Sequence, residues 1–145
     1  MSFIAQASIT LPVSAEAAFD RLADHESWPS WMPASFMPVG PSAGRLRVGS
    51  KVRVRILGSK VPVSIRIRVV DRPREITWGG GVPGVFLADH RFLFEPRGES
   101  SVEVRSVETW SGIIASLFRR TLLSQAERVG KDQLGALARA VTTGR

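Results

Sequence analysis

The sequence predicts an α+β fold in which a curved antiparallel sheet of about seven strands wraps around one long C-terminal helix. Alternation of apolar and polar residues recurs along the chain as far as Trp110, in segments that short turns connect. The one long helical periodicity runs from about Ser116 to Thr142. An antiparallel sheet with one apolar face needs a cover, and this helix is the one long element available.

The N-terminal part predicts a strand followed by two short helices. Residues 3–11 alternate in polarity and end at Pro12, as a strand does. Ser14 is a suitable N-cap for a helix that reaches about Leu22. Asp24 is expected to cap a second short helix over residues 24–31.

The remaining strands follow from alternation and from turn residues. Prolines and glycines within residues 34–48 predict an irregular edge strand. Regular strands are expected at residues 51–57, 63–69, 75–78, 85–95 and 101–110. Residues 79–84, Gly-Gly-Gly-Val-Pro-Gly, are expected to form either a mobile lid or a plain hairpin loop. They lack the spacing of a phosphate-binding loop.

Composition limits the classes of function. The 145 residues are expected to form a single domain, 1–145, with a globular balance of 43% hydrophobic and 23% charged residues. No apolar run approaches the ~20 residues that span a bilayer. Because no signal peptide is recognisable, a cytoplasmic location is expected. Without cysteine, and with two histidines outside any ligand spacing, we expect no metal site and no cofactor.

The C-terminal helix carries unusually small residues in the middle of its apolar face. Ala126 and Gly130 lie between larger apolar residues, and a helical glycine costs about 1 kcal/mol relative to alanine. Two explanations stay open: another part of the chain approaches closely at Gly130, or the helix lies over a space.

Two stretches resemble the START-like (SRPBCC) superfamily, whose helix-grip fold is shared by the birch pollen allergens. These are "ITLPVSAEAAFDRLADHESWPSWMP" (residues 9–33) and "HRFLFEPRGESSVEVRSVETWSG" (residues 90–112). The pattern is most similar to the polyketide cyclase/dehydratase group. The resemblance implies a hydrophobic cavity between sheet and helix. Activity stays open, because such folds serve carriers, sensors and enzymes.

A hairpin that turns around Gly98 would pair Phe94 with Val102 and would make His90 and Glu108 diagonal neighbours on the inner face. Burial would then perturb the pKa values of both groups. They are interpreted as a satisfied internal pair, as ligand-orienting groups, or as a general acid and base; Glu108 could instead hold the start of the last helix. The expected ligand-binding residues are Trp78, His90, Phe92, Phe94, Val104, Ser106, Glu108, Arg119, Leu122, Ala126, Val129 and Gly130.

Other candidate features are weaker. No serine is marked as activated, so a Ser–His–Asp arrangement is not expected. Arg119 is expected either to reach Glu108 or a ligand, or to point to water. Trp28, Trp31 and Trp110 are expected to form an aromatic surface near the opening of the cavity.

The net charge of +7 comes mainly from arginines that are spread along the chain. Four of them alternate with apolar residues on adjacent strands and are expected to share the outer face; these strand arginines are Arg53, Arg55, Arg66 and Arg68. They could meet an anionic membrane or partner, whereas the lack of interleaved aromatics argues against nucleic acid.

Three functions are therefore weighed. The leading hypothesis is binding of a small hydrophobic molecule, such as a lipid, sterol or polyketide. The first alternative is a cyclase/dehydratase that uses His90 and Glu108 for proton transfer, so whether the protein is an enzyme stays open. The second alternative is a non-enzymatic interaction module that works through the strand arginines. A monomer or a homodimer is expected.

Overall fold

The structure, a computed structural model, describes residues 2–41, 44–57 and 60–143. Its elements are β1 (Ser2–Leu11), α1 (Ala15–Ala23), η1 (His25–Ser27), α2 (Trp28–Trp31), β2 (Phe36–Pro38), β3 (Lys51–Ile56), β4 (Val63–Asp71), β5 (Glu75–Val82), β6 (Phe86–Pro96), β7 (Val102–Ser111), α3 (Ile113–Leu117) and α4 (Arg119–Thr143). The strands form one seven-stranded antiparallel sheet in the order β1-β7-β6-β5-β4-β3-β2. The predicted α+β class is confirmed.

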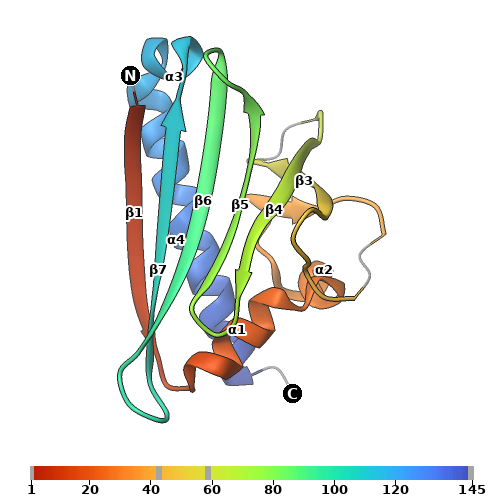
Figure 1. Cartoon of the computed structure of the whole chain (residues 1–145), viewed down its shortest axis with the longest axis vertical. Coiled ribbons are helices and arrows are strands. Elements are labelled where there is room, and N and C mark those ends of the chain that lie inside the picture. Colours follow the sequence, from red (N-terminus) through yellow and green to blue (C-terminus); the bar gives the residue numbers. More distant parts are fainter. Residues whose placement is uncertain (1, 42–43, 58–59, 144–145) are drawn as a thin grey trace.

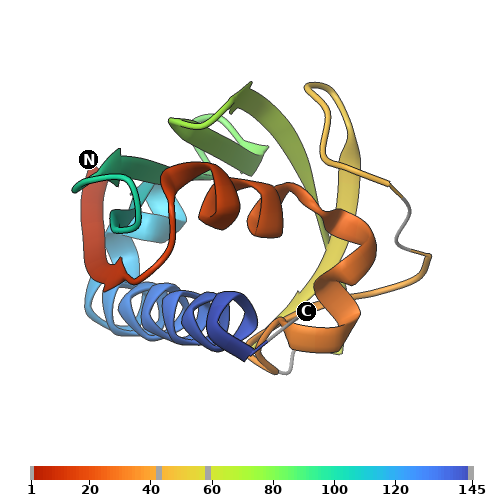
Figure 2. The ribbon, with the colours of Figure 1, turned by 90° about the horizontal axis from the view of Figure 1, so that it is seen from below.

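The sheet curls into a half-barrel, and α4 runs along its concave side (Figures 1 and 2). α4 packs mainly on β1, with further contacts to β7, α1 and α2. The short helices α1 and α2 lie at one end of the sheet, and α3 lies at the other end. No helix in the described part of the chain is long and apolar enough to cross a membrane.

The helices after β1 agree in part with the prediction. Ser14 caps α1 as expected, because its Oγ accepts a hydrogen bond from the backbone N–H of Ala17 at 3.1 Å. The predicted second helix is wrong in detail, since it is split into η1 and α2 and the Asp24 side chain makes no capping bond. The expected surface position of Trp28 is also wrong: it is fully buried and donates to the Leu22 carbonyl at 2.8 Å.

The predicted loop over residues 79–84 is largely a strand instead. β5 continues through Gly79 to Val82 and pairs with β6, with Gly79 opposite Asp89 and Gly80 opposite Ala88. A Cβ placed on Gly79 would lie 2.6 Å from the Ala88 carbonyl oxygen. The glycine therefore permits a close approach of the two backbones, which its low strand propensity hides from the sequence pattern.

The predicted long C-terminal helix is confirmed as α4, although it begins at Arg119 instead of about Ser116. Phe118 leaves the helical region, with φ −110° and ψ 29°, and separates α3 from α4. α3 is bound to the β5–β6 connection, because the N–H groups of Ile113 and Ile114 donate to the carbonyls of Gly84 and Val85 at 3.1 and 3.0 Å. α4 follows the sheet, so the chain changes direction at Phe118.

Candidate functional site

The inner face of β6 and β7 carries polar side chains in an apolar interior. His90 lies directly opposite Glu108 in the sheet, and Phe92 lies opposite Ser106. The predicted register is therefore wrong by two residues, although the predicted inner face is correct. The turn is centred one residue later than expected, since the Arg97 N–H donates to the Ser101 carbonyl at 2.8 Å.

Ser106, His90 and Glu108 form a line of hydrogen-bonding groups. His90 Nε2 lies 2.6 Å from Ser106 Oγ, and His90 Nδ1 lies 3.7 Å from Glu108 Oε1. Glu108 Oε2 accepts a hydrogen bond of 3.0 Å from Trp110 Nε1. The three side chains come from two strands, and all three were expected on the inner face.

α4 closes over this line at Gly130. A Cβ placed on Gly130 would lie 3.0 Å from Ser106 Oγ and 3.6 Å from Glu108 Oε1. The predicted space between Gly130 and the sheet is wrong, and the alternative of a close approach explains the glycine. Ser106 is 1% exposed beneath the helix. Its hydroxyl orients His90 and is not open to attack a substrate.

Burial shifts the pKa values of both ionisable groups in this line. Desolvation lowers the pKa of His90 to about 3, so its imidazole is neutral at physiological pH. Desolvation also raises the pKa of Glu108 to about 7, against the opposing hydrogen bond from Trp110. The carboxyl group therefore exists in both protonation states near neutral pH, which suits a group that gives and takes a proton.

Glu108 Oε1 is buried and has no hydrogen-bond partner among the described residues. When Glu108 is protonated, this oxygen can donate to His90 Nδ1 or to a ligand; when it is ionised, it can only accept. A buried carboxyl oxygen without a full hydrogen bond is destabilising, because its hydration is lost without replacement. A polar atom of a ligand at this point would restore the bond.

An aromatic cluster adjoins the polar line. Trp78 is its centre, with ring centroids 5.1 Å from Phe92, 5.5 Å from His90, 5.5 Å from Trp28 and 5.7 Å from Phe36. The His90 ring stacks on Phe92 at 4.2 Å. This stacking and the Ser106 hydrogen bond hold the imidazole in one orientation, with Nδ1 toward Glu108.

The other expected site residues divide into two groups. Val104, Ala126 and Val129 are buried, and Phe94 is buried against Phe19 with ring centroids 5.4 Å apart. Leu122 is half-buried and Arg119 is exposed. Arg119 therefore points to water, the second of its two expected positions.

Gln133 was missed by the sequence prediction. Its side chain is 2% exposed, and neither Oε1 nor Nε2 has a hydrogen-bond partner among the described residues. The signal was present in the spacing, because Gln133 follows Ala126 by seven residues and two helical turns bring both to the same face. α4 thus adds a second buried polar group without a partner.

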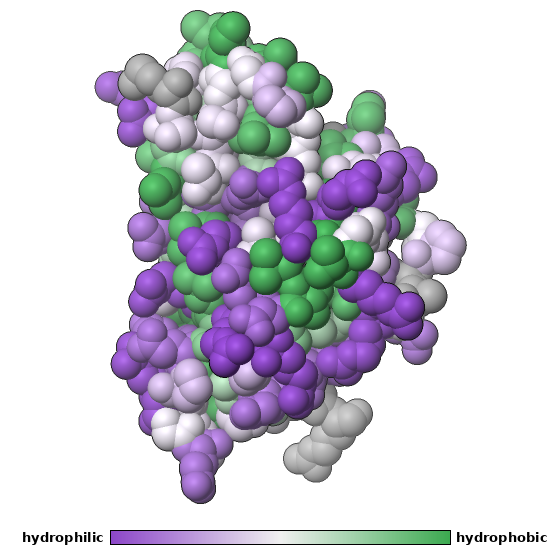
Figure 3. Space-filling model, viewed as in Figure 1, coloured by the Kyte–Doolittle hydropathy of each residue, from purple (hydrophilic) through white to green (hydrophobic). Residues whose placement is uncertain are grey.

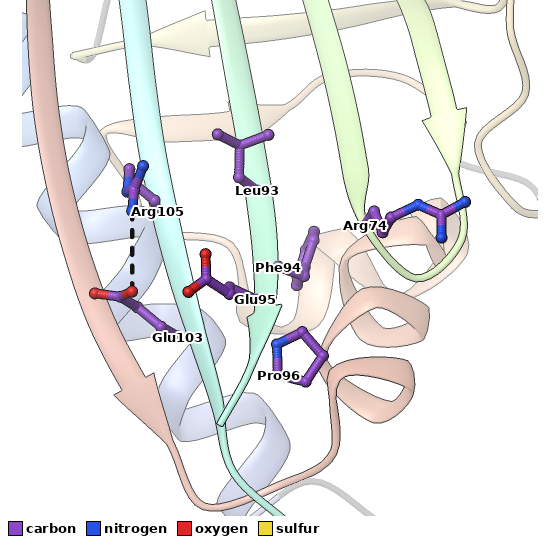
Figure 4. A pocket seen from close by; sticks show the side chains of 7 residues that line it. All are labelled: Arg74, Leu93, Phe94, Glu95, Pro96, Glu103 and Arg105. Carbon is purple, nitrogen blue, oxygen red and sulfur yellow. Dashed lines mark ion pairs between the residues drawn. The ribbon is translucent and has the colours of Figure 1, made fainter. Parts of the chain in front are cut away.

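An open pocket of about 340 Å³ lies between the β4–β5 turn and the strands β6 and β7 (Figure 4). Its lining residues are Arg74, Leu93, Phe94, Glu95, Pro96, Glu103 and Arg105. Both acidic groups already pair with Arg97, at 3.0 Å for Glu95 and 2.6 Å for Glu103. This pocket is on the opposite face from His90 and Glu108.

The strand arginines do not form a uniform free patch. Arg68 pairs with Asp89 at 2.6 Å, and Arg55 donates to the Lys60 carbonyl at 2.7 Å. Arg66 lies opposite Lys51, and Arg53 is exposed on the same strand as Lys51. Within the described ranges, no group of three or more histidine and carboxylate side chains is placed to hold a metal.

The fold and the buried polar line define an α+β protein of the helix-grip class, with ionisable groups between sheet and helix. The chain belongs to the family described as polyketide cyclase / dehydrase and lipid transport, which matches residues 2–142. The predicted superfamily is confirmed. No curated protein sequence matches the chain.

Solved structures share the fold at low sequence identity. An aromatase/cyclase from a Streptomyces species has a TM-score of 0.74 and 14% identity, covering 98% of this chain and 94% of its own. Norcoclaurine synthase from Thalictrum flavum, in complex with a transition-state analogue, has a TM-score of 0.72 and 12% identity, covering 98% and 95%. A hypothetical protein from Helicobacter pylori has a TM-score of 0.74 and 14% identity, covering 99% and 88%.

Proposed function

We propose that this protein binds a small hydrophobic molecule with one polar end between the sheet and α4, where Glu108 meets the polar end. The observation that carries the proposal is Glu108 Oε1, which is buried and has no hydrogen-bond partner among the described residues. The aromatic cluster around Trp78 offers flat apolar surface beside it. Family membership supports a ligand of polyketide or lipid type.

Gly130 gives no support for a ligand space, because close packing on Ser106 explains its small size. Support comes instead from Glu108 and from Gln133 of α4, because buried polar groups are rarely left without partners. A ligand with a carbonyl or hydroxyl group would complete the hydrogen bonding of the interior.

The protonation state of Glu108 favours a second candidate, proton transfer during cyclisation or dehydration of a polyketide-like substrate. A carboxyl group with a pKa of about 7, beside a neutral imidazole, can take a proton from a carbon next to a carbonyl and return one to a departing hydroxyl. The cyclase among the structures of similar fold is consistent with this chemistry.

Binding is tested by native mass spectrometry and tryptophan fluorescence against a fatty acid, a sterol and a hydroxylated aromatic polyketide. We expect one class to bind and Glu108→Gln to weaken it at least about tenfold, since hydrogen bonds to ionisable groups contribute ~1.5–3 kcal/mol. Glu127→Gln, on the exposed side of α4, is the matched control and should bind like wild type. Failure of all three classes to bind, or equal binding by Glu108→Gln, contradicts the proposal.

Proton transfer is tested separately on any ligand that is converted. His90→Gln should lower kcat with little effect on KM, and the pH profile of wild type should show a group titrating near the pKa of Glu108. If His90→Gln turns over the ligand as fast as wild type does, proton transfer by His90 is contradicted and only the binding proposal stands.

A further inference from the structure

The end of the molecule that carries α3 has a concentrated group of exposed apolar side chains. Among the described residues, ten large hydrophobic side chains are exposed, and six of them lie on α3 and the adjoining β5–β6 connection. These six, the apolar tip, are Val82, Val85, Ile113, Ile114, Leu117 and Phe118. Leu117 is 73% exposed and Phe118 is 58% exposed. Apolar side chains gather at this end in Figure 3.

The two segments of the apolar tip form one surface. The hydrogen bonds from the N–H groups of Ile113 and Ile114 to the carbonyls of Gly84 and Val85 hold α3 against the β5–β6 connection. Beneath them, the Trp110 ring packs edge-to-face on Phe86 with centroids 5.2 Å apart. The exposed side chains therefore protrude from a packed base.

The charged residues next to the apolar tip along α4 are arginines. Arg119 and Arg120 follow Phe118 directly, are exposed, and form no ion pair among the described residues. The chain has no acidic residue between Glu108 and Glu127, and no charged residue from Ile76 to Ala88. Long arginine stems can lie along an apolar layer while the guanidinium groups stay at its charged boundary.

We propose that the apolar tip inserts into the surface of a bilayer that contains anionic phospholipid, with Arg119 and Arg120 at the headgroups. Apolar side chains bordered by arginine match the apolar interior and anionic surface of such a bilayer. The tip is a narrow end of the molecule, formed by one strand connection and one short helix, which suits penetration of a soft layer (Figure 1). A second copy is disfavoured as occupant, because the net charge of +7 makes two chains repel. This inference goes beyond the proposed function and does not depend on Glu108.

The test is co-sedimentation with vesicles of phosphatidylcholine alone and of an equal mixture with phosphatidylserine. Wild type should bind the mixed vesicles more tightly. Leu117→Asp with Phe118→Asp should reduce the partition coefficient at least about tenfold, since each side chain loses its transfer into the apolar layer. Arg119→Gln with Arg120→Gln should reduce binding to mixed vesicles by about fivefold per arginine and leave binding to phosphatidylcholine unchanged.

Two controls keep the inference open to refutation. Val48→Asp changes a side chain that is 66% exposed outside the tip and should bind like wild type. Arg53→Gln with Arg66→Gln tests the strand arginines. Absence of wild-type binding to mixed vesicles, or equal binding by Leu117→Asp with Phe118→Asp, overturns the proposal. If the strand-arginine variant loses more binding to mixed vesicles than the Arg119 and Arg120 variant does, the outer face of the sheet contacts the bilayer and the proposal is wrong. A dimer that the tip aspartates dissociate identifies a second copy as the occupant.

Discussion

Replacing Glu108 with glutamine is expected to change the slope of stability against pH. The folded-state pKa of Glu108, about 7, lies above the ordinary value of 4.5. Between these values the folded chain holds a proton that the unfolded chain has released. The stability from this group is present below pH 4.5 and is lost as the pH rises toward 7, by about 1.4 kcal/mol per pH unit.

His90 acts in the opposite direction. Its folded-state pKa of about 3 lies below the ordinary value of 6.5, so the unfolded chain binds the extra proton. Stability from His90 is present above pH 6.5 and is lost as the pH falls toward 3. Between pH 4.5 and 6.5, the opposite slopes of His90 and Glu108 cancel in wild type.

In each single variant, the unfolding free energy should depend on pH with the slope that the remaining group contributes. Relative to wild type, Glu108→Gln should gain unfolding free energy as the pH rises, on the order of 3 kcal/mol from pH 4.5 to 6.5. His90→Gln should lose the same amount. Urea unfolding followed by tryptophan fluorescence measures both, and the difference from wild type removes the titration of all other groups.

Glu127→Gln is the control and should run parallel to wild type across the same pH range, since Glu127 is exposed. A curve for Glu108→Gln or His90→Gln that also runs parallel to wild type would show that folding does not shift the pKa of the group that was replaced. Slopes of the reversed sign would refute desolvation as the cause.

Three further substitutions test the packing. Gly135→Ala should stabilise α4 by about 1 kcal/mol, because the new Cβ meets only the Arg139 guanidinium at 3.6 Å. Gly130→Ala should not give this stabilisation, because its new Cβ would press on Ser106 Oγ. Equal urea midpoints for the two variants would contradict the close approach of Gly130 to Ser106. Trp28→Phe should cost roughly 1–3 kcal/mol by leaving the Leu22 carbonyl buried without its donor. An unchanged thermal midpoint for Trp28→Phe would be inconsistent with that bond.

Most of the fold followed from local patterns in the sequence. Alternation placed the strands, and the Ser14 cap placed α1, because these signals depend on neighbours a few residues apart. The prediction failed where glycine is used for close contact. Gly79 and Gly80 read as a loop but extend β5. Their role depends on β6 backbone atoms that the local sequence does not reveal.

The sequence predicted correctly which residues of the candidate site lie on the inner face of the sheet, but not which of them lie opposite one another. Alternation alone put His90, Phe92, Ser106 and Glu108 on the inner side of the sheet, since parity survives a register error of two residues. The register still matters for the site, because the observed pairing puts His90 directly opposite Glu108 and leaves Ser106 as its diagonal neighbour, with Ser106 Oγ 2.6 Å from His90 Nε2. A hairpin's register depends on where its turn is centred, and Pro96 to Ser101 offer several choices.

By itself, the sequence determined the fold class and the inward face of β6 and β7, because both depend on hydrophobic periodicity. Only the tertiary structure decided that Gly130 rests on Ser106, that Trp28 is core and that Glu108 Oε1 has no hydrogen-bond partner among the residues the structure describes. It also decided that the residues just before α4 form a separate short helix, α3, with exposed apolar side chains. These outcomes depend on distances of a few ångströms between segments far apart in the chain, which periodicity does not encode.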